Sequence, residues 1–185
     1  MGAVGLIEKR VLLDASGVAQ VLDRLATEVA GLVAHGPSAV IGIQTGGVHV
    51  ARRILDRLAA RGTPLPSVGT LDITLYRDDI GMTREQPQVR RTDIPFELSR
   101  TGVVLVDDVL FTGRTVRAAL DALVDFGRPR FIRLAVLVDR GFREYPIQAD
   151  CIGLRADTEP AERVQVELVE TGAPADRVVV YERRA

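Results

Sequence analysis

The feature that most constrains this chain is the run VVLVDDVLFTGRT at residues 103–115. Its apolar residues predict a buried strand over 103–107 that ends in two adjacent carboxylates, Asp107 and Asp108. A glycine-containing turn then leads into a helical pattern over about 116–126. Because ligands of open parallel sheets bind at the carboxyl ends of the strands, the two acids are predicted to lie at a ligand site.

The turn itself favours the binding of a phosphate group. The first N–H groups of a helix have no partner within it, and together with the helix dipole they attract an anion. Gly113 permits a close approach of the backbone, and the hydroxyl groups of Thr112 and Thr115 add donors. Each half of the pattern also occurs alone, as a solvated strand end or an ordinary helix cap. Together the two halves indicate a site for a sugar phosphate.

Strands and helices alternate through most of the chain. Apolar residues recur at helical spacing from Asp14, a favourable N-cap residue, to Gly36. A second strand–turn–helix unit has its strand at 39–43, a turn ending in Gly46 and Gly47, and a helix at about 48–60. The alternation predicts a parallel sheet with right-handed crossovers. The other elements expected in this part are a strand at 67–76, a polar loop at 77–92 and a strand at 131–138.

The pattern changes after Asp139, because short strand candidates follow one another without helices, at 149–154, 164–169 and 178–181. These strands predict a small β lobe. We therefore expect an α/β fold with a central, mostly parallel sheet flanked by helices. The expected organisation is a single domain over 1–185, with a core over about 12–140 and a small C-terminal β hood over about 141–185.

Composition excludes several classes of protein. The formal net charge is −1 and the only lysine is Lys9, which excludes a globally basic nucleic-acid binder but leaves room for a basic patch. Cys151 is the only cysteine, so the chain has no internal disulfide framework and no CxxC zinc site. No apolar stretch is long enough to span a membrane, and the first residues do not form a signal peptide. We expect a soluble, cytoplasmic protein.

Four segments carry a resemblance to a known family. VDDVLFTGRT (106–115) resembles the phosphoribosyl pyrophosphate (PRPP) motif of type I phosphoribosyltransferases. Together with LDITLYRDD (71–79), ALDALVDFGRPR (119–130) and LAVLVDRGFREYPIQAD (134–150), it is similar to the PyrR family. Members of that family regulate pyrimidine operons by binding RNA and also have uracil phosphoribosyltransferase activity. The resemblance covers roughly residues 12–155 and implies the type I phosphoribosyltransferase fold.

The resemblance implies where PRPP would bind. Asp107 and Asp108 would bind the ribose hydroxyl groups and take part in catalysis. The 5-phosphate and pyrophosphate loops would supply the other contacts to PRPP or nucleotide, from Phe111, Thr112, Gly113, Arg114 and Thr115 and from Thr45, Gly46 and Gly47. Gly46 stands where the family usually has arginine, which removes one cation. The resemblance also implies Mg²⁺, held mainly by oxygen atoms of PRPP and diphosphate and by no ligand set of the protein.

Arginines of the polar loop are candidates to neutralise the leaving pyrophosphate. Arg77 and Arg90 are the two that we expect to be catalytic, with Arg84 and Arg91 as further candidates. Closure of such a loop would also exclude water from the reacting centre.

The base is expected under the C-terminal lobe, near Val138, Asp139 and Ile152. Purine phosphoribosyltransferases of this class typically place a lysine near the base. Since Lys9 precedes the first helix, a pyrimidine base is favoured. The alternatives are an orotate or purine phosphoribosyltransferase that has lost RNA binding, or an RNA-binding regulator with little enzymatic activity.

The expected partners are PRPP, uracil, UMP or UTP, and the mRNA leader of a pyrimidine operon. No membrane partner is expected, and the resemblance implies a homo-oligomer, a dimer or larger. The candidate RNA contacts are Arg24, Arg140, Arg143 and Arg155. The family's basic patch is thinned here by departures from its usual residues at Asp23, Thr27, Phe142 and Gln148.

Overall fold

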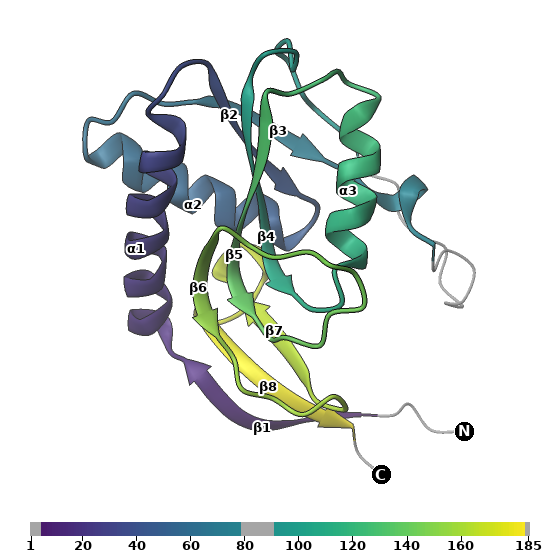
Figure 1. Ribbon diagram of the computed structural model, residues 1–185. Helices are drawn as coiled ribbons and strands as arrows, with labels where there is room; N and C mark the ends of the chain where they lie inside the picture. The colour runs from purple at the N-terminus through teal and green to yellow at the C-terminus, as the bar shows by residue number, and fades with distance from the viewer. Residues whose placement is uncertain (1–4, 79–90, 184–185) are drawn as a thin grey trace.

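Two β-sheets and three long helices make up the computed structural model, which describes residues 5–78 and 91–183 (Figure 1). The elements are, in chain order, β1 (Leu6–Leu13), α1 (Ala15–Val33), β2 (Ser38–Ile43), α2 (Gly46–Ala60), β3 (Ser67–Leu71), the 3₁₀ turn η1 (Thr74–Tyr76), β4 (Gly102–Leu110), α3 (Arg114–Val124), β5 (Phe131–Asp139), β6 (Cys151–Arg155), β7 (Arg163–Glu167), the 3₁₀ turn η2 (Val169–Thr171) and β8 (Arg177–Arg183).

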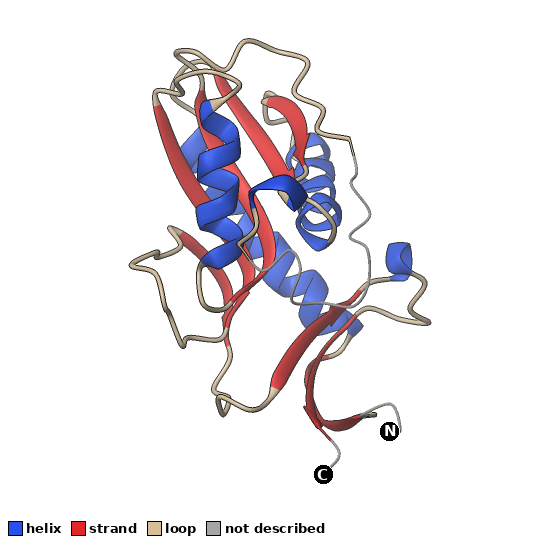
Figure 2. Cartoon of the chain, turned by 90° about the vertical axis from the view of Figure 1, so that its right-hand side faces the viewer, coloured by secondary structure: helices blue, strands red, loops and turns tan. Residues whose placement is uncertain are grey.

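The central sheet has five parallel strands in the order β3-β2-β4-β5-β6. Helices cover both of its faces, α1 and α2 on one side and α3 on the other (Figure 2). Successive residues of β4 point to opposite faces, so Val104 packs toward α1 and α2 while Leu105 packs toward α3. This arrangement explains the uninterrupted apolar runs of the central strands. The expected α/β fold with flanking helices is confirmed.

The second sheet is antiparallel, in the order β1-β8-β7, and is called the hood below. One sequence prediction about it is wrong, and one of its strands was not predicted. The strand at 149–154 was expected in the lobe, but β6 pairs in parallel with β5 inside the central sheet. Residues 6–13 were assigned to no element, but β1 forms an edge of the hood through its pairing with β8. The hood therefore combines both ends of the described chain.

Local signals fix several boundaries. The Asp14 carboxylate accepts a hydrogen bond from the Gly17 N–H at 2.8 Å, which confirms the predicted N-cap of α1. The strand predicted at 67–76 ends at Leu71, because the Asp72 carboxylate accepts bonds from the Thr74 N–H at 2.8 Å and its hydroxyl at 2.5 Å. Such a side-chain turn replaces the strand ladder with the short turn η1.

Cys151 is buried, and burial raises the pKa of its thiol to about 12, so it stays neutral at physiological pH. None of the helices in the described ranges combines the length and the apolar character that a bilayer span requires.

Candidate active site

Two carboxylates lie at the carboxyl end of β4, in the middle of the sheet. The strand extends beyond the predicted 103–107, to Leu110. Asp108, predicted in the turn, therefore lies in the strand beside Asp107. Asp107 is only 5% exposed, and its Oδ1 accepts the Asp108 N–H at 3.0 Å. Asp108 Oδ1 in turn accepts the N–H of Val109 at 2.8 Å. These bonds hold both carboxylates at the sheet edge where ligands bind.

The electrostatic environment of Asp107 is unusual for an acid. Burial raises the pKa of its carboxyl group well above the ordinary value, the charge of Asp108 raises it further, and the positive charge of Arg77 opposes the rise. Arg77 also lines the same cavity as Asp107. The structure therefore brings one predicted loop arginine to the acids. Arg84 and Arg90 lie outside the described residues, and Arg91 is exposed.

The turn after β4 forms the wall of a cavity of about 290 Å³, lined by Arg77, Asp107 and residues 109–115. Gly113 has a φ of 92° and occupies the N-cap position of α3, which begins two residues earlier than predicted. That conformation favours glycine. The first N–H groups of α3 thus open toward a small cavity beside two carboxylates, as the sequence predicted for a phosphate loop.

The Arg114 side chain is held by two acids outside the loop. Its Nε donates to Glu144 Oε2 at 2.8 Å, and its Nη1 donates to Asp78 Oδ2 at 2.8 Å. A contact of Arg114 with a phosphate is therefore predicted only through its backbone N–H.

A second helix begins at the same two acids. Gly46 and Gly47 open α2 directly against the end of β4. A Cβ atom on Gly47 would overlap the carbonyl oxygen of Val106, and one on Gly46 would overlap the Asp108 carboxylate. The glycine pair predicted as the pyrophosphate loop is therefore required by close approach. The peptide bond between Gln44 and Thr45, just before it, is cis.

The hood closes over a third part of the site. A cavity of about 600 Å³, the hood cavity below, lies between the end of β4 and the hood; it is lined by Leu6, Val109, Phe111, Arg140 and residues 160–164. Most of these residues were not predicted from the sequence, because they come from segments far apart in the chain: β1, the end of β4 and the segment that leads into β7. The side chains of Val138 and Ile152, two residues predicted near the base, pack into the two opposite core clusters, so a contact with the base through their backbone groups stays a prediction.

Arg140 was predicted to contact RNA, and this prediction is wrong because its side chain is buried. It is 5% exposed, and its guanidinium carbon lies 4.1 Å from the centre of the Phe111 ring. Its Nη1 donates to the Glu162 carbonyl at 2.7 Å, and its Nη2 donates to that of Glu159 at 3.0 Å. Arg140 therefore fixes the hood to the phosphate loop.

The other predicted RNA contacts divide into two kinds. The Arg155 and Arg24 side chains are 71% and 54% exposed, although Arg24 also donates to the Gly153 carbonyl. The Arg143 side chain is 22% exposed and bonds within the protein. Asp23, expected to repel phosphate, pairs with Arg57 of α2 at 2.7 Å. The sequence gives no sign of this pair, because its two residues lie on different helices, 34 positions apart in the chain.

The fold and the site together define a phosphoribosyltransferase. The family description Phosphoribosyl transferase domain matches residues 11–171. A hypoxanthine phosphoribosyltransferase from Staphylococcus aureus has the same fold, with a TM-score of 0.69 and 17% identity over 96% of this chain and 93% of that one. The enzyme of the same name from Trypanosoma cruzi has a TM-score of 0.71 and 16% identity, over 96% and 92% of the two chains.

Sequence relatives show which family of phosphoribosyltransferases the chain belongs to. Proteins named Bifunctional protein PyrR from Bacillus mycoides (strain KBAB4) and Bacillus cereus (strain B4264) are each 45% identical over 179 residues, which is 95% of this chain and 99% of theirs. The chain belongs to the PyrR family.

Proposed function

We propose that the protein transfers the phosphoribosyl group of PRPP to uracil and releases UMP and diphosphate. The observation that carries the proposal is the meeting of two helix N-termini at one pair of carboxylates beneath a hood. A sugar with a phosphate at one end and a pyrophosphate at the other needs two anion sites with hydrogen-bond acceptors between them. Membership of the PyrR family supports uracil as the acceptor.

In the proposed reaction, pyrophosphate leaves C1 of the ribose as a uracil nitrogen bonds to that carbon and loses its proton. The backbone N–H groups of 112–115 hold the 5-phosphate, and Asp107 and Asp108 accept hydrogen bonds from the ribose hydroxyl groups. The positive charge of Arg77 lies near the acids and stabilises the departing diphosphate. The protein forms no covalent bond with the sugar, so the rate comes from positioning and charge.

Mg²⁺ fits this arrangement. Carboxylate oxygens are ligands that Mg²⁺ accepts, and the ion usually keeps waters and substrate oxygens as its other ligands. Asp107 and Asp108 supply such oxygens at the end of β4. When bound with PRPP, the ion would neutralise charge on the diphosphate.

The hood cavity is the proposed site of the base. Its walls combine the Phe111 ring, the apolar Val109 and Val164, and the guanidinium group of Arg140. Purine pockets of this class use a lysine amine, but Lys9 is not among the residues that line the hood cavity; it lies on β1, and its amine is paired with Glu162 at 2.7 Å. These features favour a pyrimidine as the base that accepts the phosphoribosyl group. The reaction is expected to take place in the cytoplasm.

Steady-state kinetics with uracil, orotate and hypoxanthine, each with PRPP and Mg²⁺, test the proposal. We expect diphosphate release with uracil and a kcat/KM at least about tenfold lower for the other two bases, since one unsatisfied polar group in a pocket costs about this much. If orotate or hypoxanthine is turned over faster than uracil, that base is the substrate and the assignment of uracil is wrong. Release with none of the three bases would overturn the enzymatic proposal.

A second function, nucleotide-dependent RNA binding, is favoured by the exposed Arg24 and Arg155 and by the neutralisation of Asp23 by Arg57. The relatives' printed name, bifunctional protein, supports it. The test is binding of a pyrimidine-operon leader RNA at low salt with and without UMP. Binding that UMP strengthens is expected, and no binding in either condition would contradict it.

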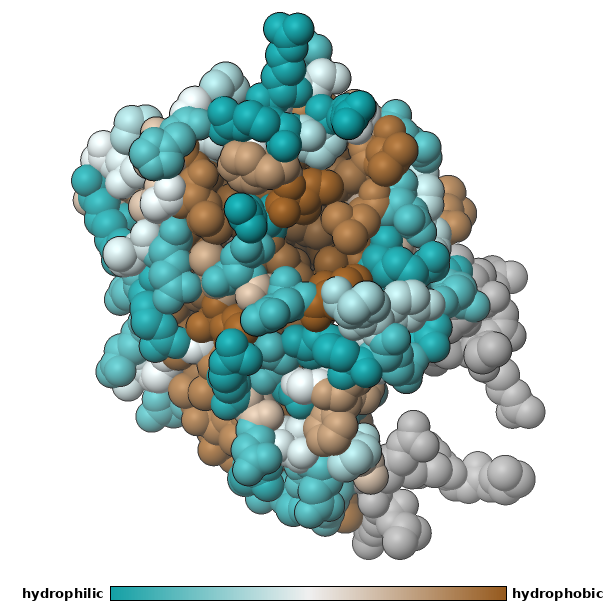
Figure 3. All heavy atoms as spheres, viewed as in Figure 1, coloured by the Kyte–Doolittle hydropathy of each residue, from teal (hydrophilic) through white to brown (hydrophobic). Residues whose placement is uncertain are grey.

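Self-association is also part of the proposal. Apolar surface gathers over the strands between α1 and α3 (Figure 3), and large exposed apolar patches mark interaction sites in water-soluble proteins. Light scattering during size-exclusion chromatography would give the mass, and a monomer at all concentrations would contradict the proposal.

A further inference from the structure

The chain between β5 and β6 runs against the phosphate loop. We call residues 140–150 the crossover segment, since they connect two parallel strands without a helix. The N–H groups of Glu144 and Tyr145 both donate to the Thr112 carbonyl, at 2.9 and 3.0 Å. A Cβ atom on Gly113 would lie 3.2 Å from the Cβ of Tyr145, which is already tight. The crossover segment therefore covers the outer side of the loop.

Arg143 connects the crossover segment to the end of β5 and to the phosphate loop. Its Nη1 donates to the Phe111 carbonyl at 2.7 Å and to the Gly141 carbonyl at 3.1 Å. Its Nε donates to the Ile147 carbonyl at 2.9 Å, and its Nη2 lies 2.7 Å from Asp139 Oδ1. One planar guanidinium group thus joins the end of β5, both halves of the crossover segment and the first residue of the phosphate loop.

We propose that Arg143 is a positioning residue for the 5-phosphate site, an inference that rests on the proposed phosphoribosyl transfer. The Phe111 carbonyl belongs to the peptide unit that carries the Thr112 N–H, so the bond from Arg143 fixes the orientation of the first loop amide. A loop that turns at Gly113 has a flexible backbone and needs such an external support. Amides that already face the phosphate position pay no reorganisation cost when it binds.

Lysine is the informative replacement for Arg143. Its ammonium group keeps the charge and can still pair with Asp139, but a single nitrogen cannot reach three carbonyls and a carboxylate in one plane. The matched control is Arg133→Lys on β5, whose exposed guanidinium lies beside the Phe131 ring and pairs at 2.9 Å with Asp150, at the β6 end of the crossover segment and away from the phosphate loop. Both variants keep the net charge, so a difference between them reports on the geometry of the guanidinium group.

The experiment measures the binding of ribose 5-phosphate by calorimetry, with steady-state kinetics beside it. For Arg143→Lys we expect affinity at least about tenfold weaker, as for a displaced positioning group. KM for PRPP should rise by a similar factor, with KM for uracil unchanged. Arg133→Lys should match the unaltered protein in its affinity for ribose 5-phosphate and in both KM values. A protein with only a structural role at Arg143 would lose active fraction, and hence kcat, with both KM values unchanged.

The outcomes separate the two proposals. If the unaltered protein does not bind ribose 5-phosphate, the proposed function fails. If it binds and Arg143→Lys binds within twofold as tightly, the positioning role is overturned. If circular dichroism shows that Arg143→Lys is unfolded, Arg143→Gln is measured in the same way. Loss of the fold in both variants also overturns the proposal, because Arg143 would then serve the whole fold.

Discussion

At the scale of single residues, Asp107 combines a functional position with an unfavourable environment. Its pKa is raised above the ordinary value chiefly by burial, so the folded state binds this proton more readily than the unfolded state does. The free energy of unfolding therefore falls as the pH rises from the ordinary pKa through the raised one, and stays lower above it. Above the raised pKa the ionised carboxylate destabilises the fold, although the proposed contact with ribose places it there.

Asp107→Asn tests this conflict between stability and activity. The amide oxygen can still accept the Asp108 N–H, but the charge is gone. At pH 7 we expect the free energy of unfolding to rise by about 1 kcal/mol, or about 2–4 °C in Tm, while kcat/KM falls about 100-fold. Thermal denaturation and diphosphate release measure the two effects. Asp56→Asn, at an exposed position on α2, should change neither. Unchanged activity in Asp107→Asn would contradict the site assignment.

The glycine pair at the start of α2 permits a second test, because the two residues meet different neighbours. Gly47→Ala would place a Cβ against the Val106 backbone and should lower the free energy of unfolding by about 1–3 kcal/mol. Gly46→Ala meets the Asp108 side chain, whose carboxylate can rotate away but whose Cβ would lie only 2.9 Å from the new atom. We expect a smaller loss of stability than for Gly47→Ala, together with loss of transferase activity, because Asp108 is displaced. Equal Tm values for the two variants, measured by calorimetry, would refute this distinction.

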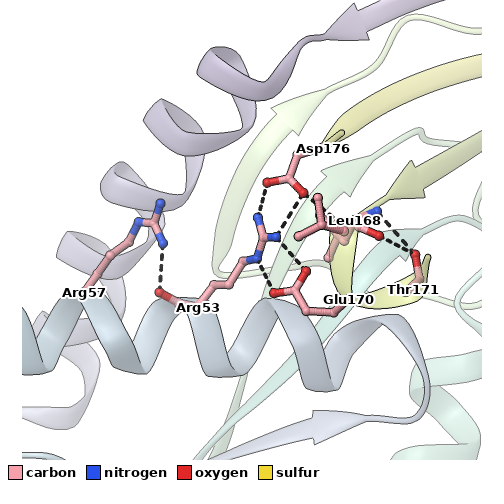
Figure 4. Close-up of polar contacts among 7 residues, drawn as sticks. Arg53, Arg57, Leu168, Glu170, Thr171 and Asp176 are labelled. Carbon is pink, nitrogen blue, oxygen red and sulfur yellow. Dashed lines mark hydrogen bonds and ion pairs between the residues drawn. The ribbon is translucent and has the colours of Figure 1, made fainter. Parts of the chain in front are cut away.

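At the scale of elements, one arginine ties α2 to the segment between β7 and β8 (Figure 4). The Nε and Nη2 of Arg53 donate to the two carboxylate oxygens of Glu170 at 2.8 and 2.6 Å. Asp176 receives two more bonds, one from Nη1 and one from Nη2 at 2.9 Å. These hydrogen bonds are the largest cause of the lowered pKa of both acids. The helix that opens at the proposed pyrophosphate loop is thus attached to the hood, which covers the proposed site of the base.

Arg53→Gln should lower the free energy of unfolding by about 2 kcal/mol at pH 7, which is the usual contribution of hydrogen bonds to charged groups in a half-buried setting. Since the pKa values of Glu170 and Asp176 are lowered in the folded state, their stabilising effect is present above their ordinary pKa values and is lost as the pH falls through the lowered ones. The difference between the two proteins should therefore shrink below about pH 4. Urea unfolding at pH 7 and pH 3.5 checks this, with the exposed Arg52→Gln as control. A difference that is constant with pH would exclude the network as its source.

Element prediction from the sequence succeeded where one local pattern decided the outcome. The three helices follow from apolar spacing, and the phosphate loop follows from the strand before it and Gly113 after it. The placement of β6 failed for a physical reason: parallel crossovers usually contain a helix, and this one is a loop fixed by Arg143. The placement of β1 failed because its partner β8 lies at the other end of the chain.

At the scale of the whole molecule, the acids and glycines of the site were predictable, and the hood cavity was not. Residue type and spacing alone identify Asp107, Gly113 and Gly47 as candidate site residues. Glu162 and Arg140 acquire their positions from contacts between distant segments, such as the pair between Lys9 and Glu162 at 2.7 Å. The base-binding part of such an enzyme is therefore the part that a single sequence predicts least well.

Charge distribution gives the last prediction. The net charge is −1, so RNA binding must depend on a few exposed arginines rather than on the total charge. Each phosphate neutralised on single-stranded RNA contributes about −0.7 to the slope of log K against log salt concentration. Arg155→Gln should reduce the slope by about this amount and leave UMP synthesis unchanged. Arg128→Gln, exposed in the turn between α3 and β5, should alter neither quantity. Filter binding at several salt concentrations measures the slope, and equal slopes for the Arg155 and Arg128 variants would remove Arg155 from the RNA surface.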